Sequence, residues 1–295
     1  MQHTTVLLHE AVDGLCIDPK DTVVDATFGS GGHAREIATL LDSDGLYIGI
    51  DADATALQRE KIGDVQCKVE LINDNFKNLT EVLSSLHIQQ VDGILADLGW
   101  RMEQFADGVK GFSFQHDGPL HMTFGEPEDY LFTAADIVNE WEETSIADVL
   151  YGYADERFSR RIAKGIVEAR KKARIDTTSQ LVEIIEQSLP KVALHKKTHP
   201  ATKTFQALRI AVNDELSVLQ QFIQTGFAAL KPGGRMAIIT FHSIEDRVVK
   251  HSFRELAQGE QGALITKKPI SPALDEITTN PRARSAKLRI IEKYP

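Results

Sequence analysis

Residues 22–33 read TVVDATFGSGGH, and this stretch decides the fold that the sequence predicts. The β-branched run Thr22–Thr27 is typical of a buried strand, and the glycines that follow allow a tight turn into a helix over His33–Leu41. In open α/β sheets, such a strand-to-helix turn lies in the crevice where ligands bind. A glycine-rich turn can also be purely structural, so this stretch alone leaves its function open.

The alternation of strand and helix continues along the chain. Further strands are predicted at 46–51, 69–74, 92–98, 235–241 and 287–292, and their apolar runs suit parallel strands covered on both faces. Between about residues 105 and 200 the pattern changes to helices with apolar spacing of three and four. We therefore predict an α/β class, Rossmann-like core made of residues 1–104 and 201–295, with a mostly helical domain inserted at 105–200.

The composition is that of an ordinary globular protein, with 42% hydrophobic residues and a net charge of −10. No apolar run approaches the roughly 20 residues that span a bilayer, and the N-terminus lacks a signal-like segment. Cys16 and Cys67 form no CxxC pair, which fits a reducing compartment. We therefore expect a cytoplasmic protein with no membrane partner.

Cations gather in one stretch despite the acidic balance. Residues 157–174 read RFSRRIAKGIVEARKKAR, with eight Lys or Arg against one Glu. Such a run is either a solvated helix face or a surface that contacts phosphate groups.

Acidic residues near the glycines indicate which cofactor the crevice would hold. Asp51 ends the second strand, where it could accept hydrogen bonds from an adenosine ribose or cap the next helix, a role that Asp53 could also take. The spacing GSGGH departs from the G-x-G-x-x-G of dinucleotide sites, and Asp25 would repel a pyrophosphate. Asp25 could instead face a cationic ligand, so the sequence favours S-adenosylmethionine over NAD.

Four other residues that end or follow a predicted strand are candidates for the site. Phe76 follows the third strand and could stack on an adenine or belong to the core. Asp97 ends the fourth strand, close to the expected transfer site, and is our candidate catalytic residue. His242 and Asp246 could act at the crevice edge, or they could be structural, with Ser243 capping the helix and Asp246 pairing with its neighbour Arg247.

A metal site is not predicted. His195 and His199 have i,i+4 spacing, but Pro200 and nearby lysines suggest a loop or a helix start, and no Cys or acidic partner accompanies them.

Longer blocks of sequence resemble one family, and they occur in that family's order. The blocks are His3–Leu8, Asp25–His33, Gly111–Phe114, Asp117–Leu120, Glu156–Phe158, His199–Thr202, Thr204–Ile210, Phe241–Arg247 and Asn280–Ser285. Together they are similar to the bacterial 16S ribosomal RNA (cytosine-N(4))-methyltransferases, the RsmH/MraW family. The resemblance implies an S-adenosylmethionine-dependent methyltransferase core whose partner is 16S ribosomal RNA within the small ribosomal subunit.

The resemblance also implies site residues, position by position. The family's cofactor residues match Gly31, Gly32, His33, Asp51, Phe76, Asp97 and Gln104, of which Gln104 comes from the resemblance alone. Given an RNA substrate, we predict RNA contacts from Arg160, Arg161, Lys164, Arg170, Lys171, Lys172, Arg174, Arg282 and Arg284. The inserted helical domain is then an RNA-recognition domain.

Two stretches depart from the family's pattern. Trp100-Arg101-Met102 stands where the family usually has an apolar residue and two serines, and His121–Phe124 replaces an acidic residue followed by Met-Arg-Met. Both lie in loops expected to flank the acceptor base, which Trp100, Phe112 or Phe114 could hold after it is turned out of its stack. These departures motivate an alternative function, a non-catalytic ribosome-assembly factor that binds S-adenosylmethionine.

Overall fold

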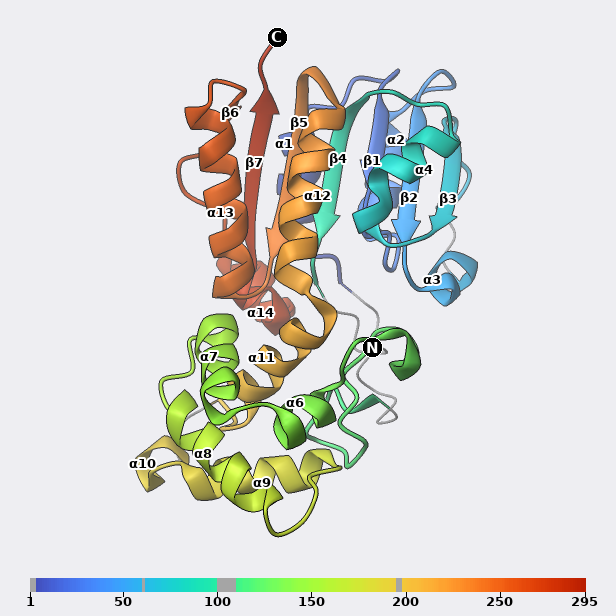
Figure 1. The fold of residues 1–295 in the computed structure, drawn as a ribbon. Coiled ribbons are helices and arrows are strands. Elements are labelled where there is room, and N and C mark those ends of the chain that lie inside the picture. Colours follow the sequence, from blue (N-terminus) through green and yellow to red (C-terminus); the bar gives the residue numbers. More distant parts are fainter. Residues whose placement is uncertain (1–3, 60–61, 100–109, 195–197) are drawn as a thin grey trace. The chain divides into compact units, whose positions relative to one another are not determined.

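The computed structural model describes residues 4–59, 62–99, 110–194 and 198–295 and divides into two compact units (Figure 1). The first unit is Met1–Gly99 with Leu216–Pro295, and the second is Trp100–Glu215. The boundaries expected from the sequence were 104/105 and 200/201. The difference arises because helix α11 (Thr202–Asn213), assigned to the core by the sequence pattern, packs against α7 (Glu143–Ala154) in the second unit.

The first unit is built on a seven-stranded sheet in the order β3-β2-β1-β4-β5-β7-β6. Its strands are β1 (Thr22–Asp25), β2 (Leu46–Asp51), β3 (Lys68–Asn73), β4 (Val91–Asp97), β5 (Leu230–Thr240), β6 (Gly262–Leu264) and β7 (Lys287–Lys293). Strands β1 to β5 are parallel, whereas β7 runs antiparallel to both β5 and β6. The strand order reverses between β1 and β4, so the carboxyl ends of these two strands flank the crevice where open α/β sheets bind ligands.

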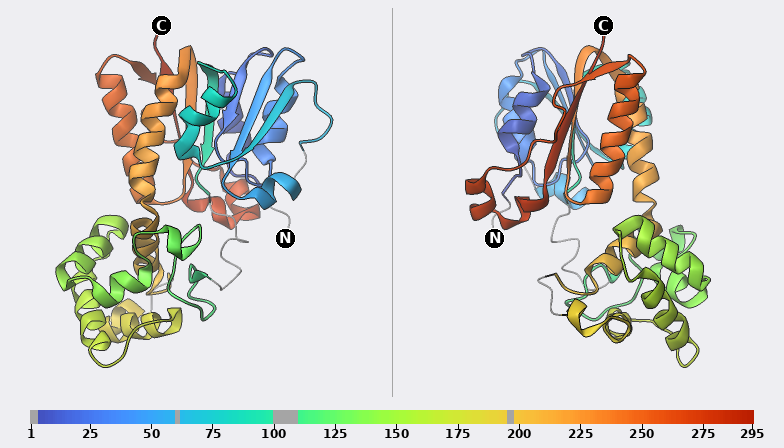
Figure 2. Two further views of the ribbon diagram at one scale, coloured as in Figure 1. Left: turned by 45° about the vertical axis from the view of Figure 1, so that its right-hand side comes forward. Right: turned by 90° about the vertical axis from the view of Figure 1, so that its left-hand side faces the viewer.

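Helices cover both faces of this sheet (Figure 2). The helices are α1 (Leu8–Leu15), α2 (Gly32–Leu40), α3 (Ala54–Arg59), α4 (Leu79–Ser85), α12 (Glu215–Ala229), α13 (Ser243–Gln258) and α14 (Leu274–Thr279). Val23 packs in one core cluster with residues of α1 and α2, and its neighbour Val24 packs in the other with residues of α4, α12 and α13. Alternate side chains of each strand are therefore buried on opposite faces, which explains the uninterrupted apolar runs.

Two strand boundaries differ from the sequence prediction by more than one residue. Strand β1 ends at Asp25 rather than Thr27, because the chain already turns there toward α2. Strand β5 begins at Leu230 rather than Arg235 and passes through Lys231–Gly234, whose Lys-Pro-Gly-Gly sequence is typical of a turn. The pairing of β5 with β4 shifts register between Val91 and Gly93, so the strand continues across this irregular segment.

The second unit is helical and has a core of its own. Its helices are α6 (Ala134–Glu140), α7, α8 (Ser159–Arg170), α9 (Thr178–Ser188), α10 (Lys191–Leu194) and α11. Capping boxes at Thr133 and Thr177 begin α6 and α9. Helix α8 buries Ile162, Ala163 and Ile166 in the shared apolar core, which leaves Arg160, Arg161 and Lys164 toward solvent.

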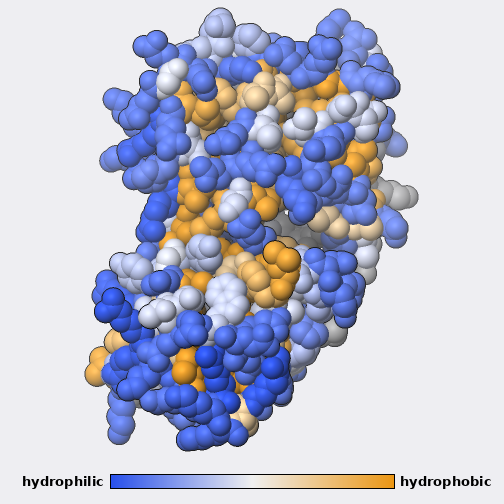
Figure 3. Space-filling view, viewed as in Figure 1, coloured by the Kyte–Doolittle hydropathy of each residue, from blue (hydrophilic) through white to orange (hydrophobic). Residues whose placement is uncertain are grey.

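Among the described residues, no helix is both long enough and apolar enough to cross a membrane. In Figure 3 hydrophilic residues cover most of the visible face, with smaller hydrophobic areas between them.

Candidate functional site

The turn between β1 and α2 depends on its glycines for two different reasons. Gly29 and Gly31 have φ of 57° and 68°, in the left-handed region that side chains other than glycine rarely adopt. Gly32 has an ordinary φ, but a Cβ there would overlap the Thr5 hydroxyl. Of the predicted cofactor residues, Gly31 therefore shapes the turn, and Gly32 allows the N-terminal segment to pack against it.

Asp51 lies directly beside this turn. One carboxylate oxygen accepts a hydrogen bond from the Gly29 N–H at 2.7 Å, and the other accepts from the Asp53 N–H at 2.8 Å. The Asn73 side chain donates to the Asp51 carbonyl at 2.9 Å. Asp53 itself accepts from the Thr55 N–H and hydroxyl, so Asp53 supplies the local cap at the start of α3. Asp51 is thus oriented toward the glycine turn, as a ribose-binding carboxylate requires.

Asp97 and His33 come together at the switch point. The Asp97 N–H donates to the Thr27 hydroxyl at 2.6 Å, which ties the end of β4 to the end of β1. One Asp97 carboxylate oxygen accepts from the Gly99 N–H at 3.0 Å, and the other lies 3.8 Å from His33 Nδ1. The His33 and Asp97 side chains are only 6% and 16% exposed, so this pair is held in a sheltered place.

Asp25 lies below this pair and is almost fully buried. Its carboxylate accepts from the Tyr47 hydroxyl at 3.0 Å and from the Thr27 N–H at 3.1 Å. Burial is the main cause that raises the pKa of Asp25 to about 6, and the Asp97 charge adds to it. The His33 charge and both hydrogen bonds act in the opposite direction and lower the pKa. Because the side chain is buried, its charge acts on the crevice through space. Direct contact with a ligand is not available to it.

Tyr47 was not anticipated from the sequence. It is fully buried in β2, and burial, together with the Asp25 charge, raises the pKa of its hydroxyl well above the ordinary value. A tyrosine within an apolar strand is typical of a core residue, so no sequence signal distinguished it. The strand register brings β2 against β1 and makes the pair with Asp25 visible only in the structure.

Phe76 begins the 3₁₀ turn η1 (Phe76–Asn78) after β3 and is partly buried. Its ring meets Phe222 edge to face, with centroids 5.0 Å apart, so one side of the ring belongs to the core. The adenine contact stays a prediction. Gln104, the remaining predicted cofactor residue, lies outside the described residues.

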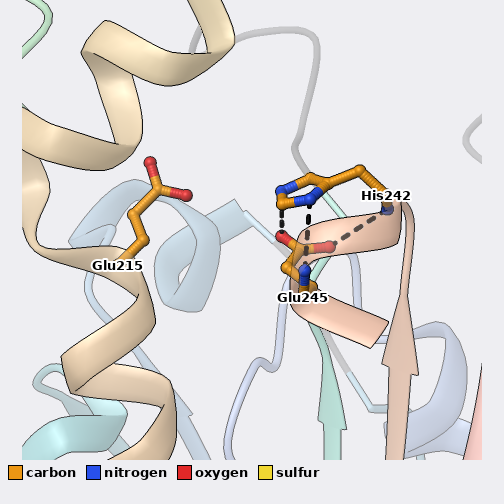
Figure 4. Close-up of side chains that lie close together, drawn as sticks. All are labelled: Glu215, His242 and Glu245. Carbon is orange, nitrogen blue, oxygen red and sulfur yellow. Dashed lines mark hydrogen bonds and ion pairs between the residues drawn. The ribbon is translucent and has the colours of Figure 1, made fainter. Parts of the chain in front are cut away.

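His242 and Glu245 form a reciprocal cap at the start of α13 (Figure 4). His242 Nδ1 accepts from the Glu245 N–H at 3.3 Å, and the Glu245 carboxylate accepts from the His242 N–H at 3.3 Å. The N-cap is therefore His242, and the expectation that Ser243 caps this helix is wrong. Glu215, also drawn, belongs to the second unit, where its carboxylate lies 2.7 Å from Arg209.

Asp246 is held by β7. Its carboxylate accepts from Arg289 Nε at 2.7 Å and from Lys287 Nζ at 3.0 Å. Burial alone would raise the pKa of Asp246, but the hydrogen bonds from Arg289 and Lys287 outweigh it and lower the pKa. Asp246 therefore ties α13 to the sheet through distant partners, in place of the neighbouring Arg247.

The cations predicted to bind RNA fall into two groups. Six of them are exposed and form no ion pair with a described residue. They are Arg160, Arg161, Lys171 and Lys172, on and after α8, and Arg282 and Arg284 in the 3₁₀ turn η4 (Pro281–Ser285). Three others already have protein partners: Lys164 lies 3.8 Å from Glu168, Arg170 donates to the carbonyls of Val138 and Trp141, and Arg174 lies within 4.0 Å of Asp136, Glu140 and Asp176.

The aromatic residues proposed to hold a base lie in the second unit. Phe112 stacks on Phe124 with centroids 5.6 Å apart. Phe114 stacks on His199 at 4.4 Å and meets Phe205 edge to face, so it packs against the helical core. Trp100, Arg101, Met102 and His195 lie outside the described residues.

The second stretch that departs from the family's pattern is largely structural. Met122 and Thr123 are fully buried, and Met122 has a left-handed φ of 56°. Asn213 donates to the Met122 carbonyl at 2.7 Å and accepts from the Phe124 N–H at 3.0 Å. Only Phe124, 39% exposed, presents a sizeable part of its side chain to solvent in this group.

A doubly wound sheet with a glycine turn, Asp51 and Asp97 gathered at its switch point defines a Rossmann-like α/β core. A helical unit is inserted into it between β4 and α12.

The chain belongs to the MraW methylase family, whose model matches residues 1–294. It is 42% identical to ribosomal RNA small subunit methyltransferase H of Brevibacillus brevis and 43% identical to the protein of the same name from Limosilactobacillus fermentum. Each alignment covers 99% of this chain and 98% of the relative. A solved rRNA methylase from Streptococcus thermophilus aligns over all of both chains, with a TM-score of 0.45 and 14% identity. The family predicted from the ordered blocks is confirmed.

Proposed function

We propose that this protein transfers a methyl group from S-adenosylmethionine to the exocyclic amine of a cytosine in 16S ribosomal RNA of the small subunit. The observation that carries the proposal is the match to a methylase family along almost the whole chain, including the residues that converge at the switch point. We further propose that it acts in the cytoplasm, because its substrate is the assembling small subunit.

The crevice suits a cationic methyl donor. Asp25, Asp51 and Asp97 place three carboxyl groups around the glycine turn, against one histidine, His33. This surplus of negative charge would attract a sulfonium and an ammonium group and repel a pyrophosphate. The left-handed Gly31 leaves the turn without a side chain, so a ligand can approach the backbone there.

The bound S-adenosylmethionine would supply an electrophilic methyl group. Asp51 would accept hydrogen bonds from the ribose hydroxyls, since its carboxylate is already oriented by Gly29 and Asp53. His33 would lie against the methionine part of the donor beside Asp97. Phe76 and Gln104 would complete the pocket, with Phe76 against the adenine, as the match to the family implies.

Asp97 has the position to assist the transfer. A cytosine amine is a weak nucleophile because its lone pair is delocalised into the ring, and a hydrogen bond from the amine to a carboxylate favours the pyramidal nitrogen that attacks. Asp97 is oriented by the Gly99 N–H and held at the end of β4, so it can accept that bond without reorganising. Alignment of amine and methyl group would supply much of the acceleration, on the order of 7–11 kcal/mol in favourable cases.

The inserted unit would bind the RNA. The exposed cations Arg160, Arg161, Lys171 and Lys172, together with Arg282 and Arg284 of the first unit, would contact phosphates. Arg170, Lys164 and Arg174 were predicted for the same role, and they would contribute only if they exchange their present protein partners.

The test is methyl transfer from labelled S-adenosylmethionine to small subunits that lack the modification, with the product nucleoside identified by mass spectrometry. We expect N4-methylated cytidine, and a decrease of at least about 100-fold in kcat for Asp97→Asn, the range seen when one preorganised group is lost. Asp44→Asn removes an exposed carboxylate whose one ion-pair partner among the described residues is Lys20, and it is the matched control. Protein that binds S-adenosylmethionine but transfers no methyl group would contradict the proposal and support the assembly-factor alternative.

A further inference from the structure

Four cations surround a shallow hollow at the β7 side of the first unit. Lys250 and Arg254 come from α13, Lys267 from the segment after β6, and Arg289 from β7. Thr266 adds a hydroxyl, and the other lining residues are apolar. The hollow is small, with a volume of only about 10 Å³, and no Asp or Glu lines it. We refer to it as the α13–β7 notch.

The backbone holds the walls of the notch in place. The segment after β6 is tied to β7 at both ends, because the Ile265 N–H donates to the Ile290 carbonyl at 3.1 Å and Ile270 exchanges two hydrogen bonds of 2.9 Å with Leu288. The residues between these ties, Thr266 and Lys267 among them, therefore bow away from the strand and form one wall. The opposite wall is α13, which packs against β6 and β7.

The charges in the notch are not balanced by the protein. Arg289 and Lys287 share the single carboxylate of Asp246, which leaves this group of three with one excess positive charge. Among the described residues, neither Lys250, Arg254 nor Lys267 forms an ion pair. Lys250 and Arg254 also stand at i,i+4 on one helix face, where like charges destabilise the helix.

An unbalanced group of cations is unexpected on a chain whose net charge is −10. A solvated lysine needs no explanation, but four cations from three separate elements that line one hollow form a concentrated positive field. Such a field attracts phosphate, and a guanidinium with two ammonium groups can contact adjacent phosphate oxygens. The hollow is too small to enclose a small ligand, so its cations suit a phosphate backbone that passes over them.

We propose that the α13–β7 notch binds the phosphate backbone of the RNA substrate. Its cations are other residues than those of α8 and than Arg282 and Arg284. The inference rests on the proposed function, because it takes RNA to be the substrate. Contacts of this kind position the RNA without reading its sequence. Loss of the notch should therefore weaken RNA binding and raise KM for the small subunit, with kcat unchanged.

The test compares two double variants with the same change of charge. K250Q/R254Q removes the helix side of the notch, and K20Q/K68Q removes two exposed lysines, one before β1 and one on the edge strand β3 at the other side of the sheet. K267Q tests the second wall independently of the helix. Binding of a fluorescein-labelled small-subunit ribosomal RNA transcript is measured by anisotropy over a series of KCl concentrations, and methyl transfer to small subunits is measured in parallel.

For K250Q/R254Q we expect the salt slope to fall by about 1.4 and the affinity at roughly 150 mM KCl to fall about tenfold, since each lost phosphate contact on a single strand removes about 0.7 of slope. K267Q should lose about half of that slope, and K20Q/K68Q should match the unmodified protein. If K250Q/R254Q and K20Q/K68Q show equal salt slopes, in protein that binds RNA and transfers methyl groups, the notch proposal is overturned and the proposed function stays intact. If the unmodified protein neither binds the transcript nor methylates small subunits, the proposed function fails, and the notch proposal fails with it.

Discussion

Replacement of Asp25 by Asn should change the stability of the protein in a manner that depends on pH. The folded protein raises the pKa of Asp25 from 3.8 to about 6, mainly because the carboxyl is buried. At a pH between 3.8 and about 6, the carboxyl of Asp25 is therefore protonated in the folded state and ionised in the unfolded state. Because the unfolded state binds fewer protons in this window, stability falls as the pH rises from about 4 to about 6. Above that pH the buried charge destabilises the fold by a constant amount.

The magnitude follows from the size of the shift. A change of one pKa unit corresponds to 1.36 kcal/mol, so the shift from 3.8 to about 6 corresponds to about 3 kcal/mol. Asn cannot ionise and retains an oxygen that can accept from the Thr27 N–H. At a pH of about 4 more than half of this shift is still to be expressed, because the unfolded carboxyl is only partly ionised there. The free energy of unfolding of Asp25→Asn minus that of the unmodified protein should therefore increase by about 2 kcal/mol between pH of about 4 and about 7.5.

The assay is urea unfolding followed by far-ultraviolet circular dichroism, with both proteins measured at each pH. Comparison at equal pH removes the contributions of all other carboxyl groups, because they titrate in both proteins. A difference that is constant with pH, or that decreases as the pH rises, would refute the reasoning. Tyr47→Phe is the companion variant: it removes a hydrogen bond that lowers the pKa of Asp25, so the decline in stability should extend to higher pH.

Three further predictions concern binding and stability. Asp51→Ala should weaken S-adenosylmethionine binding by more than about tenfold, because the ribose hydroxyls and the Gly29 N–H lose the same acceptor. Isothermal titration calorimetry measures this affinity, and an unchanged value would exclude Asp51 from the cofactor site. Arg160→Gln with Arg161→Gln should reduce the affinity for ribosomal RNA and leave thermal stability nearly unchanged. Arg170→Gln should do the reverse, lowering the free energy of unfolding by about 2 kcal/mol, because its guanidinium donates to two carbonyls. If Arg170→Gln instead affected only RNA binding, its assignment as a structural residue would be wrong.

The strands of the first unit were predictable because their physical signal is local. Strand β2 has the predicted bounds, Leu46–Asp51, since a buried parallel strand must be apolar throughout and ends where the chain needs polar groups at the crevice. The start of β5 could not be predicted in the same way. Residues 231–234 carry a turn-like sequence, and only pairing with β4 across a register shift keeps them in the strand.

Side-chain roles that depend on distant partners were the least predictable. Arg170 belongs to a basic run in the sequence, yet the fold brings Val138 and Trp141 within hydrogen-bonding distance of it. Asp246 was expected to pair with the next residue, and its partners are on β7, about 40 positions along the chain. The position of Asp51 and Asp97 at one edge of the sheet was easier to predict, because the carboxyl ends of parallel strands always meet there.

The distribution of charge separates the two ligands that the proposed reaction requires. The crevice concentrates carboxyl groups at Asp25, Asp51 and Asp97, a field that favours a cationic donor and opposes a polyanion. RNA must therefore be held by cations on other elements, such as α8, η4 and the α13–β7 notch, so that only the acceptor base has to enter the acidic site. Surface contacts to phosphate weaken steeply with salt, whereas a sheltered pair such as His33 and Asp97 is screened much less. Higher salt should then raise KM for the small subunit far more than it raises the dissociation constant for S-adenosylmethionine, and equal changes in both would contradict this separation.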